Sequence, residues 1–117
     1  MTIFETFALL VFCHALSDYP VQATWIATTK SHKNPHPSGY PWYQSLMAHS
    51  VIHGGFVGIV TGSLFFAVLE TFLHFCIDFL KNQGSFGSGA RAVNIDQGLH
   101  ILCKVIWAIC STLWVAK

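Results

Sequence analysis

Apolar residues gather into four long runs along the chain, at residues 3–19, 42–60, 64–80 and 92–116. Each run approaches the roughly 20 residues that an α-helix needs to cross the hydrocarbon core of a bilayer. The composition agrees, because 53% of the 117 residues are hydrophobic and 9% are charged, whereas a soluble domain has roughly a quarter of its residues charged. The sequence therefore predicts an all-α fold, a polytopic membrane four-helix bundle that forms a single transmembrane domain over residues 1–117.

Two polar connections separate the apolar runs, one at residues 28–40 and one at residues 81–91. In a bundle of alternating helix direction, both connections emerge at one end and both termini at the other. Four of the six basic residues lie in the connections, so the positive-inside rule places the connections in the cytoplasm and the termini outside. The predicted location is the bacterial inner membrane, in a multi-pass arrangement.

Four pairs of ionisable residues interrupt the apolar runs, each with its members four positions apart: His14/Asp18, His49/His53, His74/Asp78 and Asp96/His100. A spacing of four places both side chains of a pair on one helical face, one turn apart. Because helix direction alternates, all four pairs fall at a similar depth near the cytoplasmic side. Ionisable residues are costly inside a bilayer, so these eight are expected to face the interior of the bundle and to share a partner.

A divalent cation is the simplest partner for five imidazoles and three carboxylates, because it takes lone pairs from neutral His and charge from Asp. Eight potential ligands exceed the roughly four that a single zinc ion needs, so the set predicts one or two ions. Nitrogen and oxygen ligands without thiolate fit zinc, iron or manganese, and zinc is favoured. A metal-free core of hydrogen-bonded His and Asp is the alternative.

Two further ionisable residues continue the helical faces that carry these pairs. Glu70 is one turn from His74, and Lys104 is one turn from the last His of the set. On antiparallel helices Glu70 and Lys104 fall at matching depth, so a buried ion pair between them is one interpretation. In the other, Glu70, Asp78 and Lys104 are catalytic, with Glu70 accepting a proton and Lys104 holding an anion.

Four residues near the predicted mouth of the site are candidates for substrate binding: Gln22, Lys81, Arg91 and Gln97. The amides could orient a ligand, and the basic side chains would attract a phosphate-bearing head group. The leading hypothesis is a metal-dependent hydrolase that acts on an amphiphilic substrate, such as a phosphorylated lipid, at the cytoplasmic leaflet. The cation would activate water and stabilise the negative charge of the transition state.

The motifs along the chain are His14-x3-Asp18-x3-Gln22, His49, His74-x3-Asp78-x2-Lys81 and Asp96-Gln97-x2-His100. In this order, and over nearly the whole chain, they resemble an uncharacterised family of small bacterial and phage integral membrane proteins, a domain of unknown function. That resemblance implies a small integral membrane protein and no particular activity. The His-rich motifs are also similar, more weakly, to membrane-bound metal-dependent hydrolases.

A short internal repeat relates the first run to the third. Residues 12–19 and 72–79 share the pattern Phe-x-His-x3-Asp followed by an aromatic residue. The repeat suggests two repeated helical hairpins related by a twofold axis along the membrane normal.

Other functions stay open on the sequence alone. A di-iron membrane oxidoreductase would also hold its metal with His clusters, although clusters of that kind contain more His and less Asp. A metal that only staples the bundle would suit a non-enzymatic protein that binds a host membrane protein. Ion transport is disfavoured because the outer half of the bundle has few polar residues. A net charge of +1 without a basic cluster argues against binding of nucleic acid. The expected partner is membrane lipid, and a homo-oligomer stays open.

Overall fold

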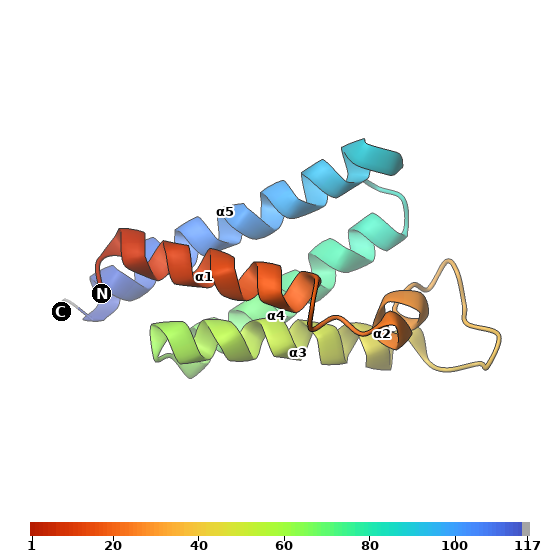
Figure 1. Cartoon of the computed structure of the whole chain (residues 1–117), viewed down its shortest axis with the longest axis horizontal. Coiled ribbons are helices and arrows are strands. Elements are labelled where there is room, and N and C mark those ends of the chain that lie inside the picture. The colour runs from red at the N-terminus through yellow and green to blue at the C-terminus, as the bar shows by residue number, and fades with distance from the viewer. Residues whose placement is uncertain (116–117) are drawn as a thin grey trace.

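The computed structural model describes residues 1–115 and arranges them in five helices (Figure 1). The helices are α1 Ile3–Asp18, α2 Thr24–Thr29, α3 Trp42–Thr61, α4 Leu64–Asn82 and α5 Gly89–Val115. Residues 1–115 contain no strand, which confirms the all-α class. The start of α1, the end of α5 and the α3–α4 turn lie at one end of the molecule, and the two longer connections lie at the other (Figure 1).

Local sequence signals set the ends of the long helices. Thr2 begins α1 with a capping box, in which its side chain accepts from the Glu5 N–H and the Glu5 carboxylate accepts from the Thr2 N–H. Gly62 ends α3 in the left-handed conformation, with φ +66°, and Ser63 caps the start of α4. These two adjacent caps turn the chain tightly and make α3 and α4 antiparallel neighbours.

Glycine allows α3 and α4 to approach each other closely. A Cβ atom on Gly54 would overlap the Thr71 hydroxyl and lie 2.5 Å from the Ala67 carbonyl oxygen. A Cβ atom on Gly58 would lie 2.9 Å from the Ala67 Cβ. Small residues at such crossings are typical of helices that pack in membranes, where close van der Waals contact drives association.

Helix α2 was not predicted, and it changes the geometry of the first connection. Pro20 disfavours helix in the residue before it, so α1 ends at Asp18 and the chain re-enters helix at Thr24. The Thr29 hydroxyl hydrogen-bonds that of Ser45 on α3, and the Asn82 amide at the end of α4 donates to the Lys30 carbonyl at 3.2 Å. These bonds fix a six-residue helix that is too short for a periodic pattern to reveal.

Polar side chains fill the interior of the bundle. Of the residues that the structure describes, eight hydrophobic side chains are buried, against fifteen polar or charged ones. The main hydrophobic cluster consists of Leu10, Val57, Phe66, Cys103, Trp107 and Ala108. Large apolar side chains lie on the outside instead, among them Phe4, Phe12, Ile59, Leu64 and Trp114. Exposed apolar surface on this scale marks a face that contacts lipid or another protein.

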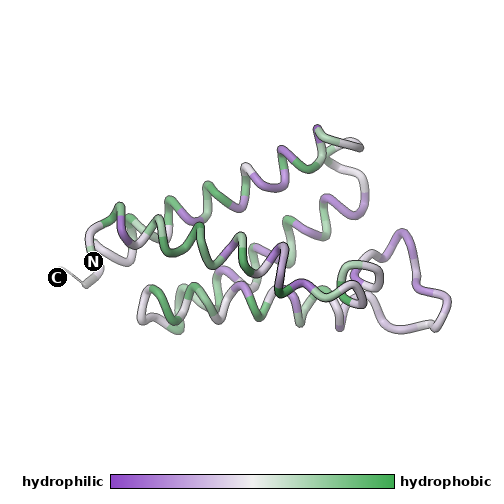
Figure 2. Tube along the Cα trace, viewed as in Figure 1, coloured by the Kyte–Doolittle hydropathy of each residue, from purple (hydrophilic) through white to green (hydrophobic). Residues whose placement is uncertain are grey.

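The helices differ in how well they meet the requirements of a membrane span. Figure 2 shows hydrophobic residues along each of the four long helices. Among residues 1–115, one helix is long and apolar enough to cross a membrane, over Gly89–Trp114. Helix α1, with 16 residues, is short for a membrane span, and α4 carries three charged residues, Glu70, Asp78 and Lys81. Crossing by all four long helices stays a prediction.

Candidate metal centre

The eight predicted metal ligands converge inside the bundle, two from each long helix. They are His14 and Asp18 of α1, His49 and His53 of α3, His74 and Asp78 of α4, and Asp96 and His100 of α5. Seven are buried and Asp18 is half-buried. The imidazole rings stack closely, with ring centroids 3.7 Å apart for His53 and His74 and 4.1 Å apart for His74 and His100. The spacing of four therefore identifies side chains that the fold brings together.

Three overlapping groups of side chains each hold their ligand atoms within 4.8 Å of one another. The groups are Asp18/His49/His53/His74, Glu70/His74/His100 and Asp78/Asp96/His100. His74 and His100 each belong to two groups, so the three form one continuous cluster. Because ligand atoms lie about 2 Å from a bound zinc ion, atoms at such mutual distances can surround a shared ion after small side-chain movements.

Asp18 connects the imidazoles of two helices. Its Oδ1 lies 2.8 Å from His53 Nε2 and 3.2 Å from His49 Nε2, both on α3. Its Oδ2 lies 3.3 Å from Nε2 of His14, one turn back on α1. A carboxylate between three imidazoles can act as a ligand or as a bridge between two ions.

Asp78 takes the equivalent position on the other side of the cluster. Its Oδ1 lies 3.1 Å from His100 Nε2, and its Oδ2 lies 3.5 Å from His74 Nε2. His49 Nε2 is also 3.5 Å from Asp78 Oδ2, so the imidazole of His49 lies between the two carboxylates. The sequence repeat around Asp18 and Asp78 thus corresponds to a repeated contact between carboxylate and imidazole.

Several buried ligand atoms of the cluster have no hydrogen-bond partner within the described chain. Both ring nitrogens of His74 are in this state, as are His49 Nε2 and Asp96 Oδ1. Buried polar atoms are almost always paired because an unpaired one costs free energy. A cation would accept a lone pair from one ring nitrogen of each imidazole and from Asp96 Oδ1, and a mixed set of imidazole and carboxylate ligands fits zinc, iron or manganese. The residues present therefore fit a divalent metal.

A buried ion pair lies beneath the cluster, as one interpretation of the sequence predicted. Lys104 Nζ pairs with Glu70 Oε1, and the Trp107 indole N–H donates to Glu70 Oε2 at 2.6 Å. Glu70 Oε1 is also 3.5 Å from His74 Nδ1. Lys104 and Glu70 are each 1% exposed, and neither lines the cavity described below. From this position Glu70 and Lys104 can help to orient His74, whereas they do not reach a substrate in the cavity.

Gln97 joins the first and last helices at the edge of the cluster. Its amide nitrogen donates to Asp18 Oδ2 at 2.9 Å and to Asp96 Oδ2 at 3.1 Å. Its carbonyl oxygen lies 2.9 Å from His14 Nε2. The residue was predicted to bind substrate, and these contacts additionally hold two carboxylates and one imidazole in place.

A cavity of about 230 Å³ opens beside the carboxylates. It is lined by Asp18, Tyr19, Gln22, Lys30, Asp78, Lys81, Val93, Asp96 and Gln97. Three of the four predicted substrate-binding residues are in this lining. Arg91 is outside it: α5 begins at Gly89, earlier than the predicted residue 92, and this places Arg91 in the exposed first turn of that helix.

Sequence reasoning did not assign Lys30 to the site. Its Nζ donates to Gln22 Oε1 at 2.7 Å and to Asp78 Oδ2 at 3.2 Å. No ionisable residue of the cluster lies three or four positions from Lys30, and Lys30 follows a helix that was not predicted. From the sequence, Lys30 is therefore interpreted as a charged residue in a loop. Its position in the polar connection next to the predicted mouth of the site was the one signal that could have assigned Lys30 to the site.

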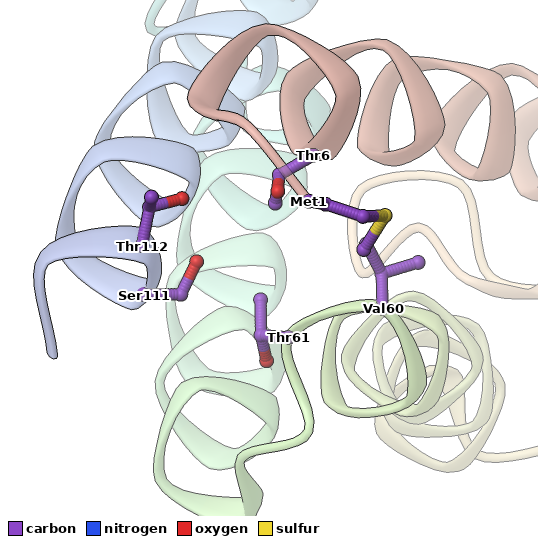
Figure 3. Close-up of a pocket in the computed structure, with 6 residues that line it drawn as sticks. All are labelled: Met1, Thr6, Val60, Thr61, Ser111 and Thr112. Atoms are coloured by element: carbon purple, nitrogen blue, oxygen red, sulfur yellow. The ribbon is translucent and has the colours of Figure 1, made fainter. Parts of the chain in front are cut away.

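A second cavity lies at the end of the bundle where α1 begins and α5 ends (Figure 3). Its volume is about 130 Å³, and it is lined by Met1, Thr6, Val60, Thr61, Ser111 and Thr112. This lining offers hydroxyl groups and a thioether but contains no carboxylate or imidazole. The second cavity is therefore not a metal centre of the same kind.

Comparison with known proteins identifies a family for the chain. No curated protein and no solved structure matches it. A family model does match, over residues 6–117, which include all eight predicted ligands. The chain belongs to the family described as "Protein of unknown function (DUF3307)".

Proposed function

We propose that the chain is an integral membrane metalloprotein, a metal-dependent hydrolase that acts on an amphiphilic substrate at the cytoplasmic leaflet. One observation carries the proposal: Asp18, Asp78 and Asp96 contact the imidazoles of the cluster and also line the open cavity. A cation held by these carboxylates would have a face toward an incoming molecule, as catalytic zinc sites do. Zinc is the proposed ion, ahead of iron and manganese.

The polarity of the bundle supports its placement in a membrane. Apolar side chains cover the outside, whereas ionisable ones are buried at the centre. The 20 residues of α3 span about 30 Å at roughly 1.5 Å per residue, which equals the thickness of the hydrocarbon core. Ionisable residues kept inside a membrane bundle are functional by default, because their burial is costly. The basic residues of the two connections favour the cytoplasmic side for the cavity.

The surface around the cavity supports an amphiphilic substrate. Tyr19 and Val93, at the rim, are 66% and 44% exposed. Farther along the same pair of helices, α1 and α5, an apolar groove is lined by Ile3, Phe4, Phe7, Val105, Ala108 and Ile109. Tyr19 and Phe7 are about 18 Å apart along α1 at roughly 1.5 Å per residue. A molecule with its polar group in the cavity could therefore place an apolar chain along α1 and α5 and into this groove.

A divalent cation would supply Lewis-acid chemistry, which activates water and stabilises a developing negative charge. The residues of the chain hold and orient the groups around it. Asp18, Asp78 and Asp96 hold the cation beside the cavity, and Gln97 keeps the first and last of these in position through two hydrogen bonds. Glu70 Oε1 lies 3.5 Å from His74 Nδ1, and Asp78 Oδ2 lies 3.5 Å from His74 Nε2, so the ring stands between these two carboxylates.

A metal that only staples the bundle is the second candidate, in a non-enzymatic protein that binds a host membrane protein. The observation that favours it is the burial of His49, His53 and His74, which are at most 2% exposed. Together with Asp18, these imidazoles could fill all four positions of one ion.

X-ray absorption spectroscopy and a turnover assay on zinc-loaded, detergent-purified protein separate the two candidates. The hydrolase proposal predicts an ion with a solvent ligand, hydrolysis of short-chain phospholipids, and loss of turnover in Asp96→Asn. A centre filled by four protein ligands, without turnover on any phospholipid tested, would favour the staple.

A further inference from the structure

Two lysines face the carboxylates across the cavity. Lys30 Nζ is 3.2 Å from Asp78 Oδ2, and Lys81 Nζ is 3.6 Å from Asp96 Oδ2. The side chain of Lys30 is 16% exposed and that of Lys81 is 34% exposed, whereas the two carboxylates are 6% and 2% exposed. The lysines therefore form the outer layer of the cavity and the acids form the inner layer.

The position of Lys30 is fixed from three sides. Asn82 of α4 donates to its carbonyl oxygen, and Thr29 beside it hydrogen-bonds Ser45 of α3. Gln22 accepts from its ammonium group at 2.7 Å, while the Gln22 amide itself donates to the Asp18 carbonyl oxygen at 3.1 Å. A lysine held in this way loses little further freedom when it binds a ligand.

The charge of the cavity depends on whether a cation is present. Asp18, Asp78 and Asp96 against Lys30 and Lys81 leave one net negative charge, which repels anions. A divalent ion on the carboxylates reverses that sign and weakens the attraction between each lysine and its aspartate. Each ammonium group then has donors free for an anion between the lysines and the cation.

We infer that this cavity binds a phosphate group, held by Lys30 and Lys81, and that it does so after the cation has bound. The inference rests on the proposed function for its cation and deepens it by naming the substrate class. A phosphate suits two lysines and a metal because it carries up to two negative charges and several acceptor oxygens, whereas a carboxylate carries one charge and two oxygens. The volume of about 230 Å³ accommodates such a group.

Calorimetric titration of purified protein with inorganic phosphate tests the inference. The zinc-loaded and desalted wild type is compared with chelator-treated wild type, with Lys30→Gln and Lys81→Gln, and with Lys33→Gln as the control, because Lys33 is exposed and outside the cavity. We expect phosphate to bind the zinc-loaded wild type and the control, and to bind both cavity variants at least roughly tenfold more weakly. Zinc per chain is measured in every sample.

Dihexanoyl phosphatidic acid, titrated in parallel, identifies the source of the phosphate. Tighter binding than inorganic phosphate supports a lipid head group, and equal binding supports recognition of the phosphate group alone. Unchanged phosphate affinity in both cavity variants, or phosphate binding without zinc, would overturn the inference while leaving the metal centre intact. A wild type that retains no metal would instead defeat the proposed function, and the inference with it.

Discussion

His53 Nε2 lies 2.8 Å from Asp18 Oδ1, across the interface between α3 and α1. The matching contact joins His100 of α5 to Asp78 of α4 at 3.1 Å. In both places, an Asp near the end of one helix meets an imidazole on the next long helix. The cluster thus contains two contacts of the same kind, and the repeat of two hairpins stays a prediction.

The buried ion pair beneath the centre predicts a large loss of stability when one partner is removed. Lys104→Met leaves the Glu70 carboxylate buried without its countercharge, and this is expected to cost about 3–5 kcal/mol. Adding Glu70→Gln removes the stranded charge and should restore most of the loss. Thermal unfolding in detergent measures both, with Lys33→Met as the exposed control. Equal stability of Lys104→Met and the control would contradict the ion pair.

Close packing of α3 on α4 predicts opposite results at two adjacent glycines. Gly54→Ala places a methyl group against Thr71 and should lower stability by about 1–3 kcal/mol, as overpacking does. The Cβ added by Gly55→Ala would meet no described atom within 4 Å, so this variant should be neutral or slightly stabilising. Unfolding midpoints in detergent compare the two. Similar midpoints would argue against the contact.

The hydrogen bonds of Gln97 predict that this residue affects metal affinity although it is not itself a ligand. Gln97→Leu removes the donor to Asp18 and Asp96 and the partner of His14, and the loss of such orienting bonds typically weakens metal binding roughly 10–100-fold. Competition with a chelating indicator measures the change. Gln44→Leu, on the exposed face of α3, is the control and should behave like wild type. An unaltered metal affinity in Gln97→Leu would contradict a role of Gln97 in positioning the ligands.

The proposed topology predicts which end of the bundle can be labelled from outside the cell. In a background with the four cysteines replaced by serine, Leu64→Cys should react with a membrane-impermeant maleimide in intact cells. Ser38→Cys should react only after lysis, because its connection is expected in the cytoplasm. Labelling of Ser38→Cys in intact cells would place the cavity on the opposite side.

The sequence was sufficient to predict the long helices and the convergence of the ligands. Both follow from period: apolar runs of helical length, and ionisable pairs such as His74 and Asp78 whose spacing fixes a shared face. The ion pair of Glu70 with Lys104 follows from the same geometry extended by one turn. These features depend on one helix or on two antiparallel neighbours.

Features that depend on irregular backbone were not predictable. Lys30 reaches Asp78 because a six-residue helix after Pro20 docks on α3 and Lys30, which follows it, binds the end of α4, and no periodic signal encodes that docking. Arg91 was expected at the mouth, but the direction of a side chain in the first turn depends on where the helix begins. Because α5 begins at Gly89, Arg91 is helical, and the five residues from Arg91 to Asp96 turn its side chain about 140° away from that of Asp96 at roughly 100° per residue.

Element-by-element analysis of bound metal in tag-free, detergent-purified protein tests the central claim most directly. Wild type and the His36→Ala control, whose substituted residue is outside the cluster, are predicted to retain one or two divalent ions per chain. His53→Ala and Asp78→Asn are predicted to lose most of this metal while remaining folded by circular dichroism. A wild type without stoichiometric metal, or variants with the same metal content as wild type, would contradict the metal centre.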